Sequence, residues 1–270
     1  MLARLLIYLC EVSPRARRML WRWWYERWAR RVQSDSWTFM NYGFAWPMGE
    51  RAPLLQEEDE PDRFCAQLYQ RVIGSARLQG KQILEVGAGR GGGAAYVKRY
   101  HDPAKLTAVD FSPQAVAFCR ERHRFGHLIF SEGDAEKLPF ADASFDGVIN
   151  VESSHCYGSI AAFFAEVTRV LRPGGFFFFA DLREAPEMQT LWHQLEALPG
   201  MSLVNTENLT PQVAAALEAD HGRKHQMIES LIPAGQRAMF REFAGLRGSS
   251  IHRNLTYGKL LYRRWVLQRM

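Results

Sequence analysis

Residues 82–92 read QILEVGAGRGG and join a short apolar run to a glycine-rich turn. The run ending at Val86 is typical of a buried parallel strand, which is apolar on both faces. Gly87, Gly89 and Gly92 give the spacing GxGxxG, at which the backbone can approach a ligand closely. This spacing alone is weak evidence, because dinucleotide-binding domains share it. The stretch predicts a strand, a ligand-binding turn and the start of a helix.

Strand and helix patterns alternate from residue 81 to about residue 181, after which the pattern is mainly helical with two further strands. Ser112 and Pro113 are typical of a helix start, and a further helix is expected over 159–171. Strands that alternate with helices form a doubly wound, Rossmann-like α/β sheet with helices on both faces. Further strands are predicted at 106–110, 127–133, 144–152, 176–182, 200–207 and 259–267, and further helices at 61–74, 187–198, 211–230 and 233–245.

Two segments are expected to lie outside this sheet. Residues 1–60 would form an N-terminal unit, with a basic and aromatic helix followed by an aromatic cap, and residues 61–270 the main domain. The helical stretch 208–245 precedes the last strand and is rich in Met and aromatic residues, which suit an apolar ligand. We predict that this insertion and the N-terminal segment form a lid. The alternative is that the insertion simply packs on the sheet.

The basic residues are concentrated at the two ends of the chain. The whole chain has a net charge of +5, whereas residues 1–31 and 243–270 each carry +6 and residues 32–242 carry −7. Trp and Arg share a helical pattern over 15–31, which is typical of a lipid headgroup boundary. This helix is predicted to contact a membrane surface or to pack on the domain. Nucleic acid is not expected, since no basic patch lies on the core.

The composition is that of an ordinary globular protein, with 47% hydrophobic and 23% charged residues. No apolar run reaches the length of a membrane span, and no signal-peptide cleavage pattern is present. We therefore expect a cytoplasmic protein, peripheral on the inner membrane face if 15–31 binds lipid. The four cysteines form no CxxC pair of the kind that binds zinc. His221 and His225 have a spacing that could bind a metal, but they are interpreted as part of a solvated helix face. No metal site is predicted.

Acidic residues stand at the ends of three predicted strands. Glu85 precedes the first glycine by two positions, where it could accept a hydrogen bond from a cationic amino-acid headgroup. Asp110 could bind both hydroxyls of a ribose, and Asp134 could meet an adenine amine. The predicted cofactor residues are Glu85, Gly87, Ala88, Gly89, Asp110, Phe111, Gly133, Asp134, Ala135 and Asn150.

These motifs, with VLRPGG at 170–175, resemble the class I S-adenosylmethionine (SAM) dependent methyltransferases over about residues 80–182. The resemblance implies SAM as cofactor and S-adenosylhomocysteine as product. MNYGFAWPM, EVGAGRGGGAAYV and GDAEKLPFADASFDGVINVESSHCY are similar to the phthiotriol/phenolphthiotriol dimycocerosates methyltransferase group, which O-methylates a secondary hydroxyl of a very long lipid. The chain departs from that group in its Trp/Arg-rich start, and it has Ala88 where many relatives have Cys or Ser.

His155 follows the fourth predicted strand, at the sheet edge where α/β proteins bind ligands. An alcohol is a poor nucleophile until its proton leaves, so a general base is expected, and His is readily tuned for that role. Asp181 ends the neighbouring strand and could orient the imidazole. Sugar O-methyltransferases with a similar segment imply the same two roles. Glu152 is an alternative base or a cofactor contact.

The sequence therefore predicts an O-methyltransferase that acts on a hydroxyl of a hydrophobic small molecule, lipid or polyketide-like, with His155 as base. The rival predictions are a C-methyltransferase of an isoprenoid or polyketide, and a non-catalytic SAM-binding scaffold. An RNA methyltransferase is disfavoured, since no base-clamping motif or RNA module is present. The predicted acceptor contacts are Tyr42, Phe44, Trp46, Cys156 and Tyr157.

Overall fold

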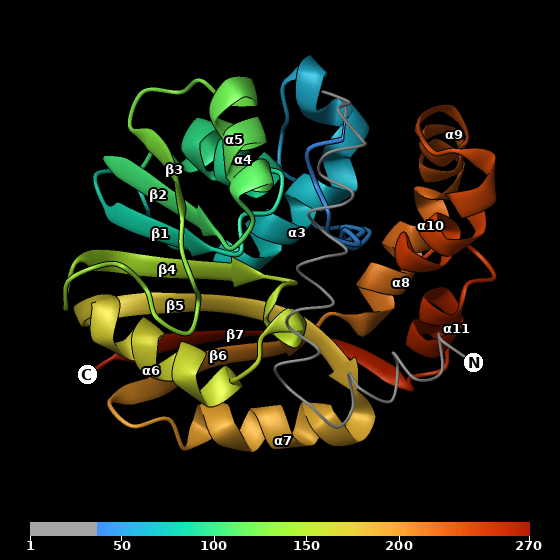
Figure 1. The fold of residues 1–270 in the computed structure, drawn as a ribbon. Helices are drawn as coiled ribbons and strands as arrows, with labels where there is room; N and C mark the ends of the chain where they lie inside the picture. The colour runs from blue at the N-terminus through green and yellow to red at the C-terminus, as the bar shows by residue number, and fades with distance from the viewer. Residues whose placement is uncertain (1–36) are drawn as a thin grey trace.

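The fold is a seven-stranded sheet with helices on both faces, in a computed structural model that describes residues 37–270 (Figure 1). The predicted helix at 15–31 lies outside the described residues. The strand order is β3-β2-β1-β4-β5-β7-β6. The strands are β1 (Gln82–Val86), β2 (Lys105–Asp110), β3 (Leu128–Glu132), β4 (Phe145–Val151), β5 (Leu171–Glu184), β6 (Met201–Asn208) and β7 (Leu260–Arg269).

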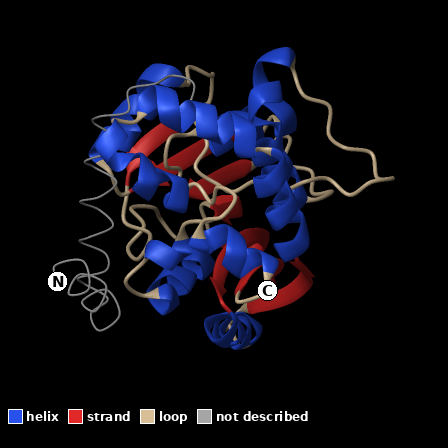
Figure 2. Ribbon diagram, turned by 90° about the vertical axis from the view of Figure 1, so that its right-hand side faces the viewer, coloured by secondary structure: helices blue, strands red, loops and turns tan. Residues whose placement is uncertain are grey.

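Strands β1 to β5 are parallel, and β7 runs antiparallel to both β5 and β6. The α/β prediction is confirmed, and the sheet is mixed because β7 alone runs against the other strands. Helices α3, α4 and α5 cover one face, and α6 and α7 cover the other (Figure 1). These helices are α3 (Arg63–Ile73), α4 (Gly92–His101), α5 (Pro113–Arg122), α6 (Ile160–Val170) and α7 (Ala185–Glu196). Figure 2 shows the same layering from the side.

The FFFF run of β5 builds the core on both faces of the sheet. Alternate side chains of a strand point to opposite faces. Phe177 and Phe179 stack in the core under α6 and α7, with their ring centroids 5.2 Å apart. Phe178 belongs to the core under α3 and α4. Trp265 of β7 stacks on Phe179 at 5.3 Å, which continues this core to the antiparallel edge. Phe177 to Phe179 are fully buried and Phe176 is half-buried, as expected for an apolar run.

The insertion between β6 and β7 differs in detail from the prediction. The single helix expected at 211–230 is two helices, α8 (Thr210–Ala219) and α9 (His221–Leu231), which meet at Asp220. Asp is a poor interior helix residue because its side chain competes for nearby hydrogen-bond donors. Here its carboxylate accepts hydrogen bonds from Arg223, at 2.6 and 2.7 Å.

Two other predicted helices begin as 3₁₀ turns. The predicted helix at 61–74 begins as a 3₁₀ turn, η1 (Glu57–Asp62), and the one at 233–245 consists of η3 (Ala234–Gln236) and α10 (Arg237–Phe243). A further helix, α11 (Ser250–Thr256), was not predicted, although Ser249 caps it by accepting the His252 amide. Among the described residues, no helix is long and apolar enough to cross a membrane.

Candidate active site

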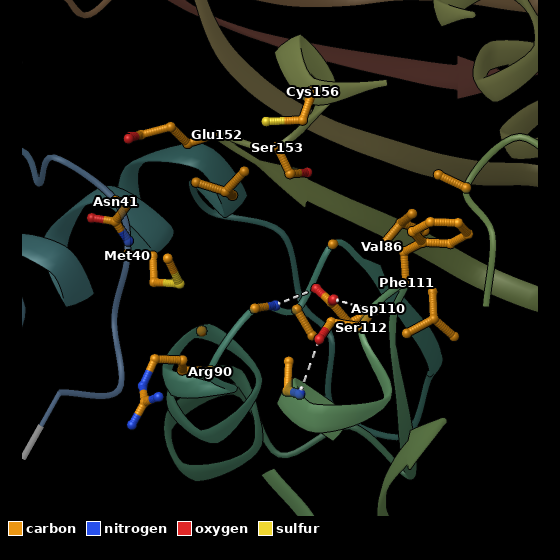
Figure 3. Close-up of a pocket in the computed structure, with 18 of the residues that line it drawn as sticks. Met40, Asn41, Val86, Arg90, Asp110, Phe111, Ser112, Glu152, Ser153 and Cys156 are labelled. Atoms are coloured by element: carbon orange, nitrogen blue, oxygen red, sulfur yellow. Dashed lines mark hydrogen bonds between the residues drawn. The ribbon is translucent and has the colours of Figure 1, made fainter. Parts of the chain in front are cut away.

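A pocket opens at the carboxyl ends of β1, β2 and β4, where ligands bind in open α/β sheets. Its walls come from the glycine-rich turn, the end of β2, the turn after β3, the segment after β4, residues 37–41 and helix α10. Figure 3 shows Met40 and Asn41 on one side, Glu152 and Cys156 on another, and Asp110 beneath. The sequence-predicted cofactor end and acceptor end therefore belong to one cavity.

Gly87 in the turn and Gly93 at the start of α4 cannot be replaced without a clash. A Cβ on Gly87, which has a φ of +78°, would lie 2.4 Å from the Ser153 hydroxyl oxygen. A Cβ on Gly93 would lie 2.0 Å from the ring of Tyr69. The amides of Gly87 and Ala88 both donate to the Val109 carbonyl, at 2.9 and 3.0 Å. The turn is thereby fixed to β2 with its backbone exposed to the pocket.

Asp110 connects the end of β2 to the glycine-rich turn. One carboxylate oxygen accepts the Gly89 amide at 2.8 Å, and the other accepts the Ser112 amide at 2.9 Å. Burial raises the pKa of Asp110, and these backbone hydrogen bonds oppose the rise. Each carboxylate oxygen has a second lone pair. Because Asp110 lines the pocket, its carboxylate fits a ribose diol.

Glu85 is buried and does not line the pocket itself, but it contacts a residue that does. The Tyr69 hydroxyl, from a residue that lines the pocket, donates to Glu85 Oε1 at 2.6 Å. Glu85 Oε2 is buried and has no partner among the described residues. Burial raises the pKa of Glu85 to about 8, although the Tyr69 hydrogen bond opposes the rise. An unpaired buried acceptor beside the glycine turn fits the ammonium group of an amino-acid cofactor such as SAM.

The other predicted cofactor residues divide into two groups. Phe111, Gly133, Asp134 and Ala135 line the pocket, whereas Asn150 does not. The Asn150 amide donates to the Val86 carbonyl and lies 2.7 and 2.9 Å from the hydroxyls of Ser153 and Tyr157. It joins β1 to the segment after β4, and the two hydroxyls in turn contact Gly87. Its position is therefore that of a support for the pocket wall.

The structure brings His155 and Asp181 together. His155 lies in η2 (Ser154–Cys156), and its Nδ1 is 2.9 Å from Asp181 Oδ1. Asp181 is fully buried within β5, directly after the part of that strand that pairs with β4, and also accepts the His155 and Leu182 amides and the Ser154 hydroxyl. Burial raises the pKa of Asp181, but Arg183, His155 and these hydrogen bonds outweigh it and hold the pKa well below its usual range. Asp181 is therefore a permanent anion.

His155 itself does not line the pocket, whereas its neighbours Ser153 and Cys156 do. Its side chain is 26% exposed, and the ring lies next to the residues that form the pocket wall. Burial lowers the pKa of His155, but the adjacent Cys156 and Asp181 outweigh that effect and hold the pKa well above its usual value. With Asp181 on Nδ1, the neutral tautomer leaves Nε2 as the basic nitrogen.

Glu152 lines the pocket directly and has an unusual backbone. Its φ is +52°, a left-handed conformation that non-glycine residues rarely adopt and that is frequent at functional sites. Its carboxylate accepts the Tyr42 amide at 3.0 Å and the Tyr262 hydroxyl at 3.1 Å. Burial raises the pKa of Glu152 to about 7, with the Tyr42 bond opposing the rise. Glu152 thus ties residues 37–46 to the end of β4.

The aromatic segment reaches the pocket through different residues from those predicted. Tyr42, Phe44 and Trp46 do not line the pocket, and Phe44 is fully buried beneath Trp46, with the ring centroids 5.7 Å apart. Cys156 and Tyr157 do line it. The predicted acceptor contacts omit a larger set of lining residues, all of which except Tyr69 belong to the two segments predicted to cover the cleft: Trp37, Thr38, Phe39, Met40, Asn41, Tyr69, Phe240 and Phe243.

Two residues of this set, Trp37 and Phe240, pack against each other in the pocket wall. Their ring centroids are 5.7 Å apart in an edge-to-face arrangement. The two residues come from opposite ends of the chain, so no local pattern could pair them. The histidines of α9 have no metal geometry: His221 and His225 are ring neighbours at 6.0 Å. Among residues 37–270, no group of three or more His, Cys, Asp or Glu could hold a metal ion.

Comparison with known proteins agrees with this geometry. A family model described as a methyltransferase domain matches residues 84–179. The phthiotriol/phenolphthiotriol dimycocerosates methyltransferase of Mycobacterium tuberculosis is 39% identical over 90% of this chain and 90% of its own length. A fatty-acid O-methyltransferase of Mycolicibacterium smegmatis is 36% identical over 88% of this chain and 84% of its own.

A solved structure has the same fold at low sequence identity. Geranyl diphosphate C-methyltransferase of Streptomyces coelicolor, in complex with S-adenosylhomocysteine, superposes with a TM-score of 0.60 and 16% identity, covering 91% of this chain and 98% of that one. The glycine turn, the Asp110 carboxylate and the match to the curated relatives lead to one conclusion. The chain is a class I SAM-dependent methyltransferase that belongs to the family of the phthiotriol/phenolphthiotriol dimycocerosates methyltransferases.

Proposed function

We propose that this enzyme transfers the SAM methyl group to a hydroxyl of an uncharged, hydrophobic acceptor of lipid or polyketide type. The observation that carries the proposal is the chemistry of the pocket wall. When bound, SAM supplies the electrophilic methyl group. The fitting residues are Asp110 for the ribose, Glu85 for the amino group, and the backbone of Gly87 and Gly89 for close approach.

Much of the cavity wall is apolar. Trp37, Met40, Phe240 and Phe243 line the cavity, as does Cys156. Apolar and aromatic walls with a few polar groups are typical of sites for hydrophobic small molecules. The two curated relatives carry names that refer to lipids, which supports a hydrophobic acceptor. A fatty acid carries a carboxylate, so the choice of a neutral hydroxyl rests on the charges of the wall.

The charges of the wall favour a neutral acceptor. The described lining residues include one basic side chain, Arg90, whose guanidinium donates to the Trp37 carbonyl and lies 3.8 Å from the centre of the Phe118 ring. Four acids line the same cavity, and Glu152 is the one at the acceptor end. A carboxylate acceptor would lie against an acid of like charge, which is unfavourable at low dielectric. The acids of this lining are Asp110, Asp134, Glu136 and Glu152.

The base proposed for the hydroxyl proton is His155. Asp181 lies 2.9 Å from Nδ1 and would hold the ring in the tautomer that has a basic Nε2. Glu152 is the alternative base, because it lines the pocket directly and its pKa is about 7. The two differ in their other contacts, since Glu152 also supports the backbone of Tyr42.

Residues 37–46 and the insertion 208–245 are proposed as the lid. Three contacts join them. The Trp37 ring packs against the Phe240 ring. The Ala45 amide donates to the Gln212 carbonyl at 3.0 Å, and the Lys224 ammonium donates to the Tyr42 carbonyl at 3.4 Å. The division into 1–60 and 61–270 stays a prediction, as do the cytoplasmic location and the membrane contact through 15–31.

The acceptor class is tested with two matched substrates. We expect the full-length enzyme with SAM to convert a long-chain secondary alcohol to its methyl ether faster than it converts a fatty acid of equal length to the methyl ester. Mass spectrometry distinguishes the two products. Glu152→Gln removes the opposing charge and should raise the relative rate with the acid. Preferential ester formation by the unaltered enzyme would contradict the proposal.

The lid is tested by hydrogen exchange. When S-adenosylhomocysteine and the acceptor bind, we expect slower amide exchange in residues 37–46 and 208–245, because closure would hold both segments over the cavity. Helix α11 does not line the pocket and serves as the internal control. Unchanged exchange in both segments, with cofactor binding confirmed by calorimetry, would show that neither closes over the ligand.

A further inference from the structure

The buried carboxylate of Asp181 has two cationic partners. Oδ1 lies 2.9 Å from His155 Nδ1, and Oδ2 lies 3.2 Å from the Arg183 guanidinium. Arg183 is two residues further along β5, and its side chain is 13% exposed. A fixed positive charge at this distance stabilises the carboxylate and weakens its pull on a proton of the imidazole. The negative charge of Asp181 is thus divided between a permanent cation and a titratable one.

Ser154 holds this arrangement in a fixed geometry. Its hydroxyl donates to Asp181 Oδ2 and accepts a hydrogen bond from Arg183 Nη2 at 2.9 Å. Arg183 also donates to the Leu182 carbonyl at 2.6 Å, which fixes the guanidinium against the strand. A planar guanidinium with several anchored donors is pre-organised, unlike a flexible ammonium.

The other charged and titratable groups around His155 come from four elements. Cys156 is its neighbour in η2, Glu152 follows β4, and both act on the imidazole electrostatically. Beyond Glu152 lie Tyr42 of the N-terminal segment and Tyr262 of β7, which both hydrogen-bond to its carboxylate. Among these described groups, Arg183 is the permanent cation that contacts the Asp181 carboxylate.

We propose that Arg183 is a positioning residue for methyl transfer: by sharing the charge of Asp181, it makes the His155 imidazole easier to deprotonate and so keeps it available as a base. The inference rests on the proposed base role of His155. It assigns Arg183 no contact with the acceptor or with SAM. Its effect would reach the reaction through Asp181 alone.

The test is a titration of His155 in the full-length protein. Histidine side chains are labelled with ¹³C and followed by NMR against pH, with the His155 resonance assigned from its absence in His155→Gln. In Arg183→Met the midpoint of His155 should rise by about one unit, because a neighbouring cation is lost and Asp181 acts on the imidazolium alone. The inflection of the pH–rate profile should move to higher pH by the same amount, and the limiting rate at high pH should stay the same.

Two further variants separate charge from packing. Arg183→Lys keeps the charge and should leave the midpoint close to that of the unaltered protein. Ser154→Ala removes one donor from Asp181 and should raise the midpoint by less than Arg183→Met does. The matched control is Arg172→Met, on the same strand, whose guanidinium pairs with Asp146 at 2.9 Å; it should leave His155 unchanged.

The outcomes are distinguishable from a failure of the proposed function, because the NMR midpoint requires no turnover. An unchanged or lower midpoint in folded Arg183→Met would overturn the charge sharing. If Arg183→Met does not fold, an unchanged midpoint in Ser154→Ala would overturn it instead. A raised midpoint with an unmoved pH–rate profile would overturn the link between Arg183 and catalysis. Normal turnover by His155→Ala would instead point to failure of the base assignment itself.

Discussion

Replacing His155 by alanine is expected to lower the rate of methyl transfer by roughly 10²–10⁴-fold, the usual contribution of a general base. An alkyl hydroxyl must lose its proton as it attacks the methyl group, and the Asp181 carboxylate, 2.9 Å from Nδ1, would stabilise the imidazolium that forms. The affinity for SAM should barely change, since the imidazole acts on the acceptor. Single-turnover kinetics at saturating SAM, with calorimetry of S-adenosylhomocysteine binding, measure the two effects separately.

Two further variants serve as comparisons for His155→Ala. Asp181→Asn should reduce the rate in the same direction but less, because the ring would lose its orientation and its counter-charge. His193→Ala is the matched control, since that histidine is 67% exposed on α7 and far from the pocket lining. Near-normal turnover by His155→Ala would rule out His155 as the essential base. The base would then be Glu152, which lines the pocket, or the reaction would need no base and depend on alignment of the reactants alone.

The pH dependence of the unaltered enzyme should have a definite sign. A base must be neutral to accept a proton, and the pKa of His155 is raised above its usual value of about 6.5. The rate should therefore rise with pH and be lost as the pH falls through that raised pKa. If Glu152 is the base instead, the inflection should lie near its pKa of about 7 and should vanish in Glu152→Gln.

The sheet was predictable because its signals are local. The apolar runs, the glycine turn and the Ser112 cap each specify an element from a few neighbouring residues, and Ser112 does accept the Ala115 amide at 3.3 Å. The pairing of His155 with Asp181 was predictable for a related reason. The parallel pairing of β4 with β5 ends at Val151 and Ala180, so residues that directly follow these two positions lie at one sheet edge and can approach each other.

Part of the pocket wall was not predictable, because its partners are far apart in the sequence. Trp37 and Phe240 meet only after the insertion has folded back over the sheet. The choice between Tyr42 and Met40 as a lining residue depends on which way each side chain points in an irregular segment, and no periodicity fixes that. Tyr69 is similar, since its helix pattern marks it as core and does not reveal its hydrogen bond to Glu85.

Asp110→Ala is expected to weaken binding of both SAM and S-adenosylhomocysteine by about 30- to 1000-fold, corresponding to the loss of roughly 2–4 kcal/mol. Two effects combine. The ribose would lose charge-assisted hydrogen bonds, and the Gly89 and Ser112 amides, which now donate to the carboxylate at 2.8 and 2.9 Å, would lose their acceptor. The glycine turn would therefore be less well fixed. Calorimetry with S-adenosylhomocysteine measures the change directly.

Asp110→Asn and Asp102→Ala complete this experiment. The asparagine keeps one acceptor oxygen and should weaken binding less than alanine, because one of the two backbone amides keeps its acceptor. Asp102, at the end of α4, is 66% exposed and pairs with Lys98 at 2.6 Å, and its loss should leave cofactor binding unchanged. Equal affinity in Asp110→Ala and the unaltered protein would show that the end of β2 does not hold the ribose. Binding of NAD(H) without S-adenosylhomocysteine would contradict the cofactor itself, since the unpaired Glu85 oxygen beside this turn suits an ammonium and disfavours a pyrophosphate.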